Sequence, residues 1–182
     1  THKFESLEEQ KEFVRIARSS GERLESLISD IVLLTDLDQG LLNCVRQTIN
    51  PDIHLLQPIR RRISRYDGKV VHFLPILSIN DEIKAPRQEF PRAILHLVDN
   101  ALKFSPEDGT VILKVTSSKN GGATITIEDQ GPGIPVGLRE KVFERYYQIS
   151  SGATRLHQGL GVGLTLARAV LRSLGGDVKI LD

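Results

Sequence analysis

The chain has 182 residues, of which 40% are hydrophobic and 26% charged, a composition that suits one medium-sized domain with a small additional element. The 24 Lys and Arg residues nearly balance the 23 Asp and Glu residues, so the net charge of +1 gives no reason to expect nucleic acid or an anionic membrane as a main partner. The single cysteine, Cys44, excludes an intrachain disulfide and a cysteine-based metal site. No run of about 18 apolar residues is present that could span a bilayer.

The chain begins Thr1-His2-Lys3-Phe4 and contains no methionine. We therefore expect it to be an excerpt from a longer protein. The lack of an apolar span in this excerpt then says little about the membrane status of the parent.

A long helix is predicted from Glu5 to Asp38, with Ser6 and Glu9 as a capping box at its start and Gly40 at its end. Its apolar residues recur at steps of three, four or seven and form a stripe typical of a helix that pairs with another helix. The stripe comprises Phe13, Ile16, Ala17, Leu24, Leu27, Ile28, Ile31 and Leu34. The run 31–34 is apolar nearly all round, which predicts burial on more than one side. We expect this helix to project from the rest of the chain as a separate dimerisation element.

Strands and helices interleave in the remainder of the chain, which predicts an α+β fold with two layers, an α/β sandwich. The predicted strands cover 45–49, 70–77, 110–116, 123–128 and the start of one at 177–181. The predicted helices cover 51–66, 86–104, 136–148 and 162–174. Asn120-Gly121-Gly122 indicates a hairpin, and the segment 149–158 has no period and is predicted to be a mobile loop.

Four short segments carry residues suited to chemistry, and the first of them is His96 to Phe104. On a helix, His96, Asn100 and Lys103 share one face. An amide oxygen suits Mg²⁺ and an ammonium group suits phosphate. Taken alone, the segment fits equally well an amphipathic helix with a polar edge.

The second segment, Asp129-Gln130-Gly131-Pro132-Gly133, directly follows a predicted strand. A carboxylate at a strand end can accept a hydrogen bond from an exocyclic amine, and the glycines allow close approach of the backbone to a flat ligand. A plain strand-to-helix turn explains the same residues, so this segment by itself is weak support for a ligand site.

The third segment, 143–147, holds aromatic residues at helical spacing, which are usually part of a core. The fourth opens a helix with Gly159, Gly161 and Gly163, and glycines at a helix start expose backbone N–H groups to an anion. A dinucleotide-binding loop would need such glycines after an early strand of a βαβ unit. Here they follow an irregular loop late in the chain, so that interpretation is set aside.

In combination, the order and spacing of the four segments resemble the N box, first glycine box, F box and second glycine box of the GHKL ATPases, and specifically of sensor histidine kinases. Asp99-Asn100-Ala101 with Lys103-Phe104-Ser105 resembles the N box, Phe143-Glu144-Arg145-Tyr146-Tyr147 the F box. The stretch 23–30 is similar to the second helix of the dimerisation and phosphotransfer domain of that family. The resemblance covers nearly the whole chain and is weak between 44 and 90.

The resemblance implies the Bergerat (GHKL) ATP-binding fold, with ATP and Mg²⁺ as cofactors. It implies that Asn100 holds Mg²⁺, with His96 as a second candidate ligand, that Lys103 contacts phosphate and that Asp129 accepts the adenine amino group. The glycines would border the ligand, and 149–158 would form the ATP lid. The implied ATP-binding residues are Asn100, Lys103, Phe104, Asp129, Gly131, Gly133, Tyr147, Gly159, Leu160, Gly161, Val162, Gly163 and Leu164.

The resemblance also implies an organisation and a set of partners. Residues 1–40 would be the second helix of an incomplete dimerisation region, and residues 41–182 an ATP-binding catalytic domain shortened at its C-terminus. The parent would be a homodimer in the cytoplasm, attached to a membrane only through parts absent here. It would transfer the γ-phosphate of ATP to a histidine outside this chain and then to a response regulator receiver domain.

Two departures from the family keep other functions open. The family usually has Asn at the position of His96, and the helix with the phosphoacceptor histidine is absent. A gyrase-type or chaperone-type ATPase would need a carboxylate base at position 96, which disfavours that alternative. A degenerate nucleotide-binding sensor, a scaffold or a phosphatase stays open, because His96 changes the expected metal site.

Overall fold

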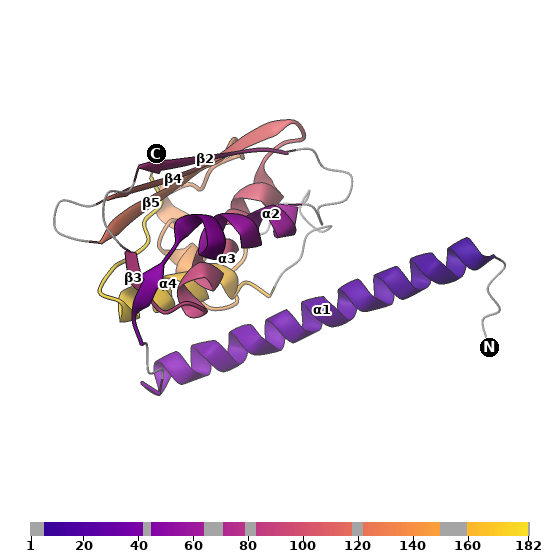
Figure 1. The fold of residues 1–182 in the computed structure, drawn as a ribbon, viewed down its shortest axis with the longest axis horizontal. Helices are drawn as coiled ribbons and strands as arrows, with labels where there is room; N and C mark the ends of the chain where they lie inside the picture. Colours follow the sequence, from indigo (N-terminus) through magenta and orange to yellow (C-terminus); the bar gives the residue numbers. More distant parts are fainter. Residues whose placement is uncertain are drawn as a thin grey trace.

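The computed structural model of the chain describes residues 6–41, 45–63, 71–78, 83–117, 122–149 and 160–181. Figure 1 shows a compact body of strands and helices with one long helix extending from it. In chain order the elements are α1 (Leu7–Asp38), β1 (Gln47–Ile49), η1 (Asp52–Leu56), α2 (Gln57–Ile63), β2 (Val71–Ser78), β3 (Ile83–Ala85), α3 (Glu89–Phe104), β4 (Gly109–Ser117), β5 (Ala123–Glu128), η2 (Val136–Leu138), η3 (Lys141–Phe143) and α4 (Gly163–Ser173).

The predicted N-terminal helix is present as α1, and its start is capped as the sequence indicates. Ser6 lies in extended backbone, and its Oγ accepts a hydrogen bond of 3.1 Å from the Glu9 N–H. Such a cap satisfies one of the backbone donors that the first helical turn leaves without an internal partner. Just beyond the helix, Gly40 takes the left-handed conformation, with φ of 65°.

The main sheet has three strands in the order β2-β4-β5. β4 and β5 pair antiparallel, with Ser117 opposite Ala123, which confirms the predicted hairpin. β2 pairs with β4 in parallel, with Val71 opposite Gly109. A parallel pair needs a long crossover connection, and here the chain between the two strands contains β3 and α3.

Beside the main sheet, a second small sheet brings the start of the domain next to the start of α3. β1 pairs antiparallel with β3, with Ile49 opposite Ile83. The helix predicted at 51–66 is present as a five-residue π-helical turn, η1, that continues into α2. The π turn leaves Leu55 and Leu56 buried.

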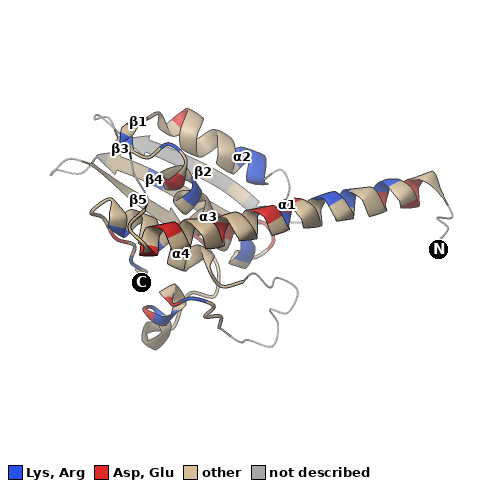
Figure 2. Ribbon diagram, turned by 90° about the horizontal axis from the view of Figure 1, so that it is seen from below, with Lys and Arg blue, Asp and Glu red and all other residues tan. Residues whose placement is uncertain are grey.

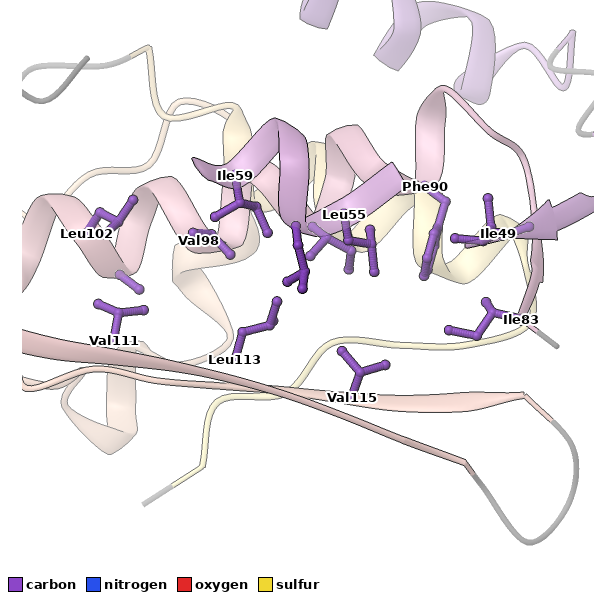
Figure 3. Close-up of a cluster of buried hydrophobic side chains, with 14 residues drawn as sticks. Ile49, Leu55, Ile59, Ile83, Phe90, Val98, Leu102, Val111, Leu113 and Val115 are labelled. Carbon is purple, nitrogen blue, oxygen red and sulfur yellow. The ribbon is translucent and has the colours of Figure 1, made fainter. Parts of the chain in front are cut away.

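The main core lies between the sheet and the helices α2 and α3, as Figure 3 shows. Val98 and Leu102 of α3 face Val111 and Leu113 of β4, and all four are at most 1% exposed. Fully burying an aliphatic side chain of this size contributes about 1.5–3 kcal/mol each. This packing fixes α3 across the sheet and thereby sets the orientation of its polar face.

A second hydrophobic cluster joins the C-terminal end of α1 to the domain. Leu33 and Leu34 of α1 pack with Ala93 of α3 and with residues of α4, among them Leu166 and Val170. The run 31–34 is therefore buried on one side, whereas Ile31 and Val32 are 41% and 53% exposed. The expectation that α1 projects separately holds for its N-terminal part and not for this end, which packs on α4 (Figure 1).

The prediction of a helix at 136–148 is wrong. The structure has two short 3₁₀ turns instead, η2 and η3, and the chain then becomes irregular. Glu144 is extended, with ψ of 149°, and Tyr146 is left-handed, with φ of 61°, so neither residue can continue a helix. Val142 and Phe143 are nevertheless buried, which explains why the apolar residues of this segment are spaced as in a helix.

The strand expected to start at 177 is also not formed, because residues 177–181 pair with none of the strands that the structure describes.

Both signs of charge are distributed along α1, and basic residues gather at the end of α2 (Figure 2). Over the described part of the chain, no helix is both long and apolar enough to cross a membrane.

Candidate functional site

Asp129 lies directly after β5, in a loop held by two hydrogen bonds. The Gly131 N–H donates to Asp129 Oδ1 at 2.7 Å, and Gln130 Oε1 accepts from the Thr110 N–H at 2.8 Å. Asp129 itself is exposed. One carboxylate oxygen is therefore fixed by its own loop, which orients the group while the second oxygen can accept from a ligand.

Gly131 brings this loop against the end of α3. A Cβ at Gly131 would lie 2.7 Å from Asp129 Oδ1 and 3.0 Å from the Phe104 carbonyl oxygen. Any larger residue would force the loop and the helix apart. The first glycine segment and the end of the His96–Phe104 segment therefore meet at this residue.

The polar face of α3 carries Asn100 and Lys103, both half-buried. The Lys103 Nζ lies 4.9 Å from the centre of the Phe104 ring. Burial, and then the positive charge of Arg23, lower the pKa of Lys103 below its ordinary value of 10.5. Ser105 follows at 2% exposure, and its Oγ is the one buried side-chain polar atom without a hydrogen-bond partner among the described residues.

The F-box segment and the second glycine segment are joined through their backbones. The Tyr146 N–H donates to the Gly161 carbonyl at 3.0 Å, and Thr165 Oγ1 donates to the Phe143 carbonyl at 2.9 Å. Gly161 is left-handed, with φ of 71°, and a Cβ there would lie 2.9 Å from the Tyr147 carbonyl oxygen. Both its conformation and its surroundings therefore require glycine.

Gly163 begins α4 and lies against α3. A Cβ at Gly163 would approach His96 Nδ1 to 3.1 Å. The second glycine segment is thus in contact with the helix that carries Asn100 and Lys103. Together with Gly131 and Gly161, this contact brings all four segments singled out in the sequence to one region of the domain.

The other ring nitrogen of His96 contacts a buried carboxylate that sequence reasoning missed. His96 Nε2 lies 3.0 Å from Asp30 Oδ1. Arg92 donates to the same oxygen through Nε at 2.9 Å and through Nη2 at 2.6 Å. Asp30 is 2% exposed and belongs to α1. A charged residue directly before the apolar run 31–34 was the available signal, because a carboxylate at a buried helix end needs a partner.

A second ion pair ties α1 to the F-box segment at the domain surface. Arg145 Nη2 donates to both oxygens of Asp38, at 2.6 and 2.5 Å. This hydrogen bond, opposed by slight burial, raises the pKa of Arg145. Next to this pair, the Arg168 guanidinium lies 4.5 Å from the centre of the Phe143 ring and fixes that residue against α4.

The residues present fit a bound nucleotide in three ways. Glycines let the four segments approach one another closely, a buried hydroxyl next to Phe104 lacks a partner, and the half-buried ammonium group of Lys103 can bind phosphate. Within the described ranges, no three His, Cys, Asp or Glu side chains are placed to hold a metal ion. Mg²⁺ commonly keeps few protein ligands, so a magnesium ion would need no such cluster, and the amide of Asn100 is the residue that would hold it.

The other predicted site residues vary in their surroundings. Tyr147 is half-buried, Leu160 is 42% exposed, and Gly133 is left-handed, with φ of 69°. Val162 is 3% exposed and packs in the second hydrophobic cluster, so a ligand could reach only its backbone. Gly159 and most of the proposed ATP lid lie outside the described residues.

Comparison with known proteins assigns the class. Residues 87–182 match the family of histidine kinase-, DNA gyrase B- and HSP90-like ATPases, and this match spans more than half of the chain. The chain therefore belongs to that family. The sequence resemblance to GHKL ATPases is confirmed, as is the expected fold class.

Among the proteins that the chain is similar to, two are named as sensor or signal-transduction histidine kinases. The sensory/regulatory protein RpfC of Xanthomonas campestris is 29% identical over 182 residues, covering 93% of this chain and 24% of RpfC. The histidine-protein kinase/phosphatase MprB of a Mycobacterium species is 33% identical over 166 residues, covering 88% of this chain and 30% of MprB. The sensor histidine kinase TmoS of Ectopseudomonas mendocina is 35% identical over 95 residues, covering 52% of this chain and 10% of TmoS. The chain thus spans less than a third of the length of each of these three relatives.

Solved structures show the same fold. The mycobacterial sensor histidine kinase MprB superposes with a TM-score of 0.64 at 27% identity, covering 74% of this chain and 84% of that one. Full-length ShkA in complex with AMPPNP superposes with a TM-score of 0.74 at 23% identity. That match covers 98% of this chain, α1 included, and 38% of ShkA.

Proposed function

We propose that this chain is the nucleotide-binding catalytic part of a sensor histidine kinase. It binds Mg-ATP and presents the γ-phosphate to a histidine that lies outside this chain, for relay to a response regulator receiver domain. Residues 1–40 form the second helix of a dimerisation and phosphotransfer region, and residues 41–182 form the catalytic domain. The parent acts as a homodimer through the N-terminal helix.

One observation carries the proposal: four segments that lie far apart in the sequence converge on one region. Phe104 contacts the Gly131 position, His96 contacts the Gly163 position, and Tyr146 is hydrogen-bonded to Gly161. Packing against protein atoms explains glycine at these positions. What supports a ligand site is that these contacts gather the residues suited to bind adenine, Mg²⁺ and phosphate on one region of the domain.

The resemblance to the family implies a role in nucleotide binding for each group at this site, and the chemistry of each group fits that role. Asp129 accepts a hydrogen bond from the adenine amino group, and Asn100 offers an amide oxygen to Mg²⁺. Lys103 and the backbone N–H groups at the start of α4 bind phosphate oxygens. Bound Mg-ATP would supply the phosphoryl group, whereas the protein contributes position and charge compensation, on which phosphoryl transfer mainly depends.

A second candidate function is a nucleotide-binding sensor or scaffold without kinase activity. His96 favours it, because it replaces the asparagine typical of the family and its Nε2 is in contact with Asp30. In that case nucleotide would bind without transfer to a supplied acceptor histidine. Mg-ATP affinity combined with absence of transfer to a related acceptor domain would identify this alternative.

Calorimetric titration with ATP tests the proposal, with Asp129→Asn as the informative variant. The amide can present its NH₂ to the adenine amine and is a weaker acceptor, so we expect affinity to fall about 10-fold or more. Glu128→Gln is the matched control, because Glu128 is adjacent and exposed and pairs with Lys114. Equal ATP affinities for the two variants would remove Asp129 from the site.

A further inference from the structure

His96 of α3 lies between α1 and α4, and a buried carboxylate of α1 fixes one side of its ring. His96 Nε2 lies 3.0 Å from Asp30 Oδ1, and Asp30 is 2% exposed. We assign the ring hydrogen to Nε2, because an ionised carboxylate only accepts hydrogen bonds. The orientation of the ring and the position of its hydrogen are therefore both set from α1.

The charge of Asp30 does not require a cationic histidine. Arg92 already compensates it, since its Nε and Nη2 donate to Asp30 Oδ1 at 2.9 Å and 2.6 Å. In a neutral ring with the hydrogen on Nε2, Nδ1 carries a lone pair. Histidine binds metal ions in this neutral form, and the ring N–H opposite the metal usually donates to a carboxylate or a carbonyl. The pair of Asp30 and His96 thus has the arrangement of a metal-binding histidine with its supporting carboxylate.

The second ring nitrogen of His96 is open at the start of α4. A Cβ at Gly163 would lie 3.1 Å from Nδ1, so the nearest backbone is that of the second glycine segment. Nδ1 has no hydrogen-bond partner among the residues that the structure describes. The buried side-chain polar atom that lacks a partner there is Ser105 Oγ and not Nδ1, so Nδ1 is accessible to solvent.

The same end of α4 offers backbone donors to an anion. The first hydrogen bond of this helix runs from the Leu166 N–H to the Val162 carbonyl, at 2.8 Å. The N–H groups of 163–165 therefore have no partner within the helix, and phosphate oxygens bind well to such groups. A cation carried by a phosphate at this place would lie beside Nδ1 of His96.

Asn100 supplies an oxygen next to this nitrogen. It follows His96 by one turn of α3, so both side chains lie on the same side of the helix. Its amide also has no hydrogen-bond partner in the described part of the chain. One nitrogen and one oxygen are too few ligands to hold a divalent cation alone, so the phosphates of the nucleotide would supply others.

We propose that His96 Nδ1 is a second protein ligand, beside Asn100, for the divalent cation that binds with the nucleotide, and that it gives the site a preference for first-row transition cations over Mg²⁺. Asp30 is the positioning residue that holds the ring. Mg²⁺ takes oxygen ligands, whereas imidazole nitrogen suits transition cations. This inference rests on the proposed function and names the class of cation that the same site takes.

Calorimetric titration of the full chain with ATP, complexed with either Mg²⁺ or Co²⁺, tests the preference. We expect the unaltered chain to bind Co-ATP about 10-fold or more tightly than Mg-ATP. His96→Asn should remove most of this difference, mainly by weakening Co-ATP binding, because an amide oxygen suits Mg²⁺. His72→Asn is the matched control, because it makes the same change at an exposed histidine of β2 and should keep the difference.

Proton NMR of the Co²⁺ complex gives a direct signature of the ligand. Paramagnetic Co²⁺ shifts the protons of a bound imidazole far outside the normal range, and the ring N–H exchanges with solvent. We expect one such shifted signal from the His96 Nε2–H, and we expect it to disappear in D₂O. The signal should be present in His72→Asn and absent from His96→Asn. It should also be absent when Co²⁺ is added without ATP, because the phosphates complete the site.

Asp30→Asn tests the positioning role. Loss of the carboxylate that supports a metal-binding histidine typically lowers metal affinity about 10–100-fold. We therefore expect the ratio of Co-ATP to Mg-ATP affinity to fall about 10-fold in this variant. Asp36→Asn on the same helix is the control and should keep the ratio. General structural damage would weaken both complexes equally, so an unchanged ratio in Asp30→Asn would overturn the positioning role.

The outcomes separate this inference from the proposed function. If the unaltered chain binds Mg-ATP but His96→Asn leaves the ratio of the two affinities unchanged, the inference is wrong and the proposed function stands. A shifted N–H signal that persists in His96→Asn, or that appears with Co²⁺ alone, would also overturn the inference. If the unaltered chain binds ATP with neither cation, both proposals fail.

Discussion

At Gly161, backbone conformation and packing impose the same requirement. Its φ of 71° is unfavourable for other residues, and a Cβ would lie 2.9 Å from the Tyr147 carbonyl oxygen. We expect Gly161→Ala to destabilise the chain by about 1–3 kcal/mol, measured by urea unfolding with circular dichroism. Gly137→Ala is the control, because no atom lies within 4 Å of its added methyl group. Equal stability of the two variants would show that Gly161 is not constrained in solution.

The residue scale also shows what the sequence could and could not predict. Asp129 and the glycines could be chosen because their order and spacing follow a family pattern. Asp30 could not, because its role depends on a contact with Arg92 and His96, more than 60 positions away. The position of His96 was predicted on the correct helix, but its partner became visible only when α1 was placed on α3.

At the scale of elements, the attachment of α1 to the domain depends on its C-terminal end. Leu34 is 4% exposed in the cluster with α4, whereas Leu24 is 59% exposed. We expect Leu34→Ala to lower the free energy of unfolding by about 2–5 kcal/mol and Leu24→Ala to lower it by less than about 0.5 kcal/mol. Both variants are measured at concentrations where the chain is monomeric. Chemical unfolding followed by circular dichroism checks the difference. Similar losses for both variants would mean that α1 does not pack on α4 as described.

The same attachment should weaken in acid. Burial raises the pKa of Asp30, but the hydrogen bond and charge of His96, and then those of Arg92, outweigh it and hold the pKa below 3.8. A lowered folded-state pKa stabilises the fold above the unfolded value, and this stabilisation is lost as pH falls through the lower folded value. The stability difference between the unaltered chain and Asp30→Asn should therefore be larger at about pH 5 than at about pH 2, and it should shrink as the pH falls below 3.8.

Unfolding free energies measured across this range check the acid prediction, with Asp36→Asn on the same helix as the matched control. A difference between the unaltered chain and Asp30→Asn that persists unchanged down to pH 2 would contradict the ionised contact.

Elements were predictable where periodicity and packing agree, and were not where they conflict. The β4–β5 hairpin follows from alternating residues around a glycine turn, and α3 from an apolar face that meets the sheet. The apolar residues of 136–148 are spaced as in a helix, but the Tyr146 N–H donates a hydrogen bond to the Gly161 carbonyl. That distant contact replaced the helix, and nothing local in the sequence indicates it.

For the molecule as a whole, we expect the chain to bind nucleotide without phosphorylating itself on histidine. A phosphoacceptor must approach the γ-phosphate in line. His96 is held between Asp30 and Gly163, His72 is exposed on β2, and His54 Nδ1 lies 3.0 Å from the Asn50 carbonyl oxygen. Incubation with radiolabelled ATP followed by acid and base treatment checks this, and acid-labile, base-stable label on the chain would contradict it.

The central claim is that this domain holds adenine nucleotide through the carboxylate of Asp129. The most direct measurement is a calorimetric comparison of ATP and GTP, each with Mg²⁺. Guanine presents a carbonyl oxygen where adenine presents an amine, so the carboxylate would face another acceptor and lose its hydrogen bond. We predict one ATP bound per chain and an affinity for GTP lower by about 10-fold or more. Equal affinities, or no binding of ATP by the folded chain, would contradict the account.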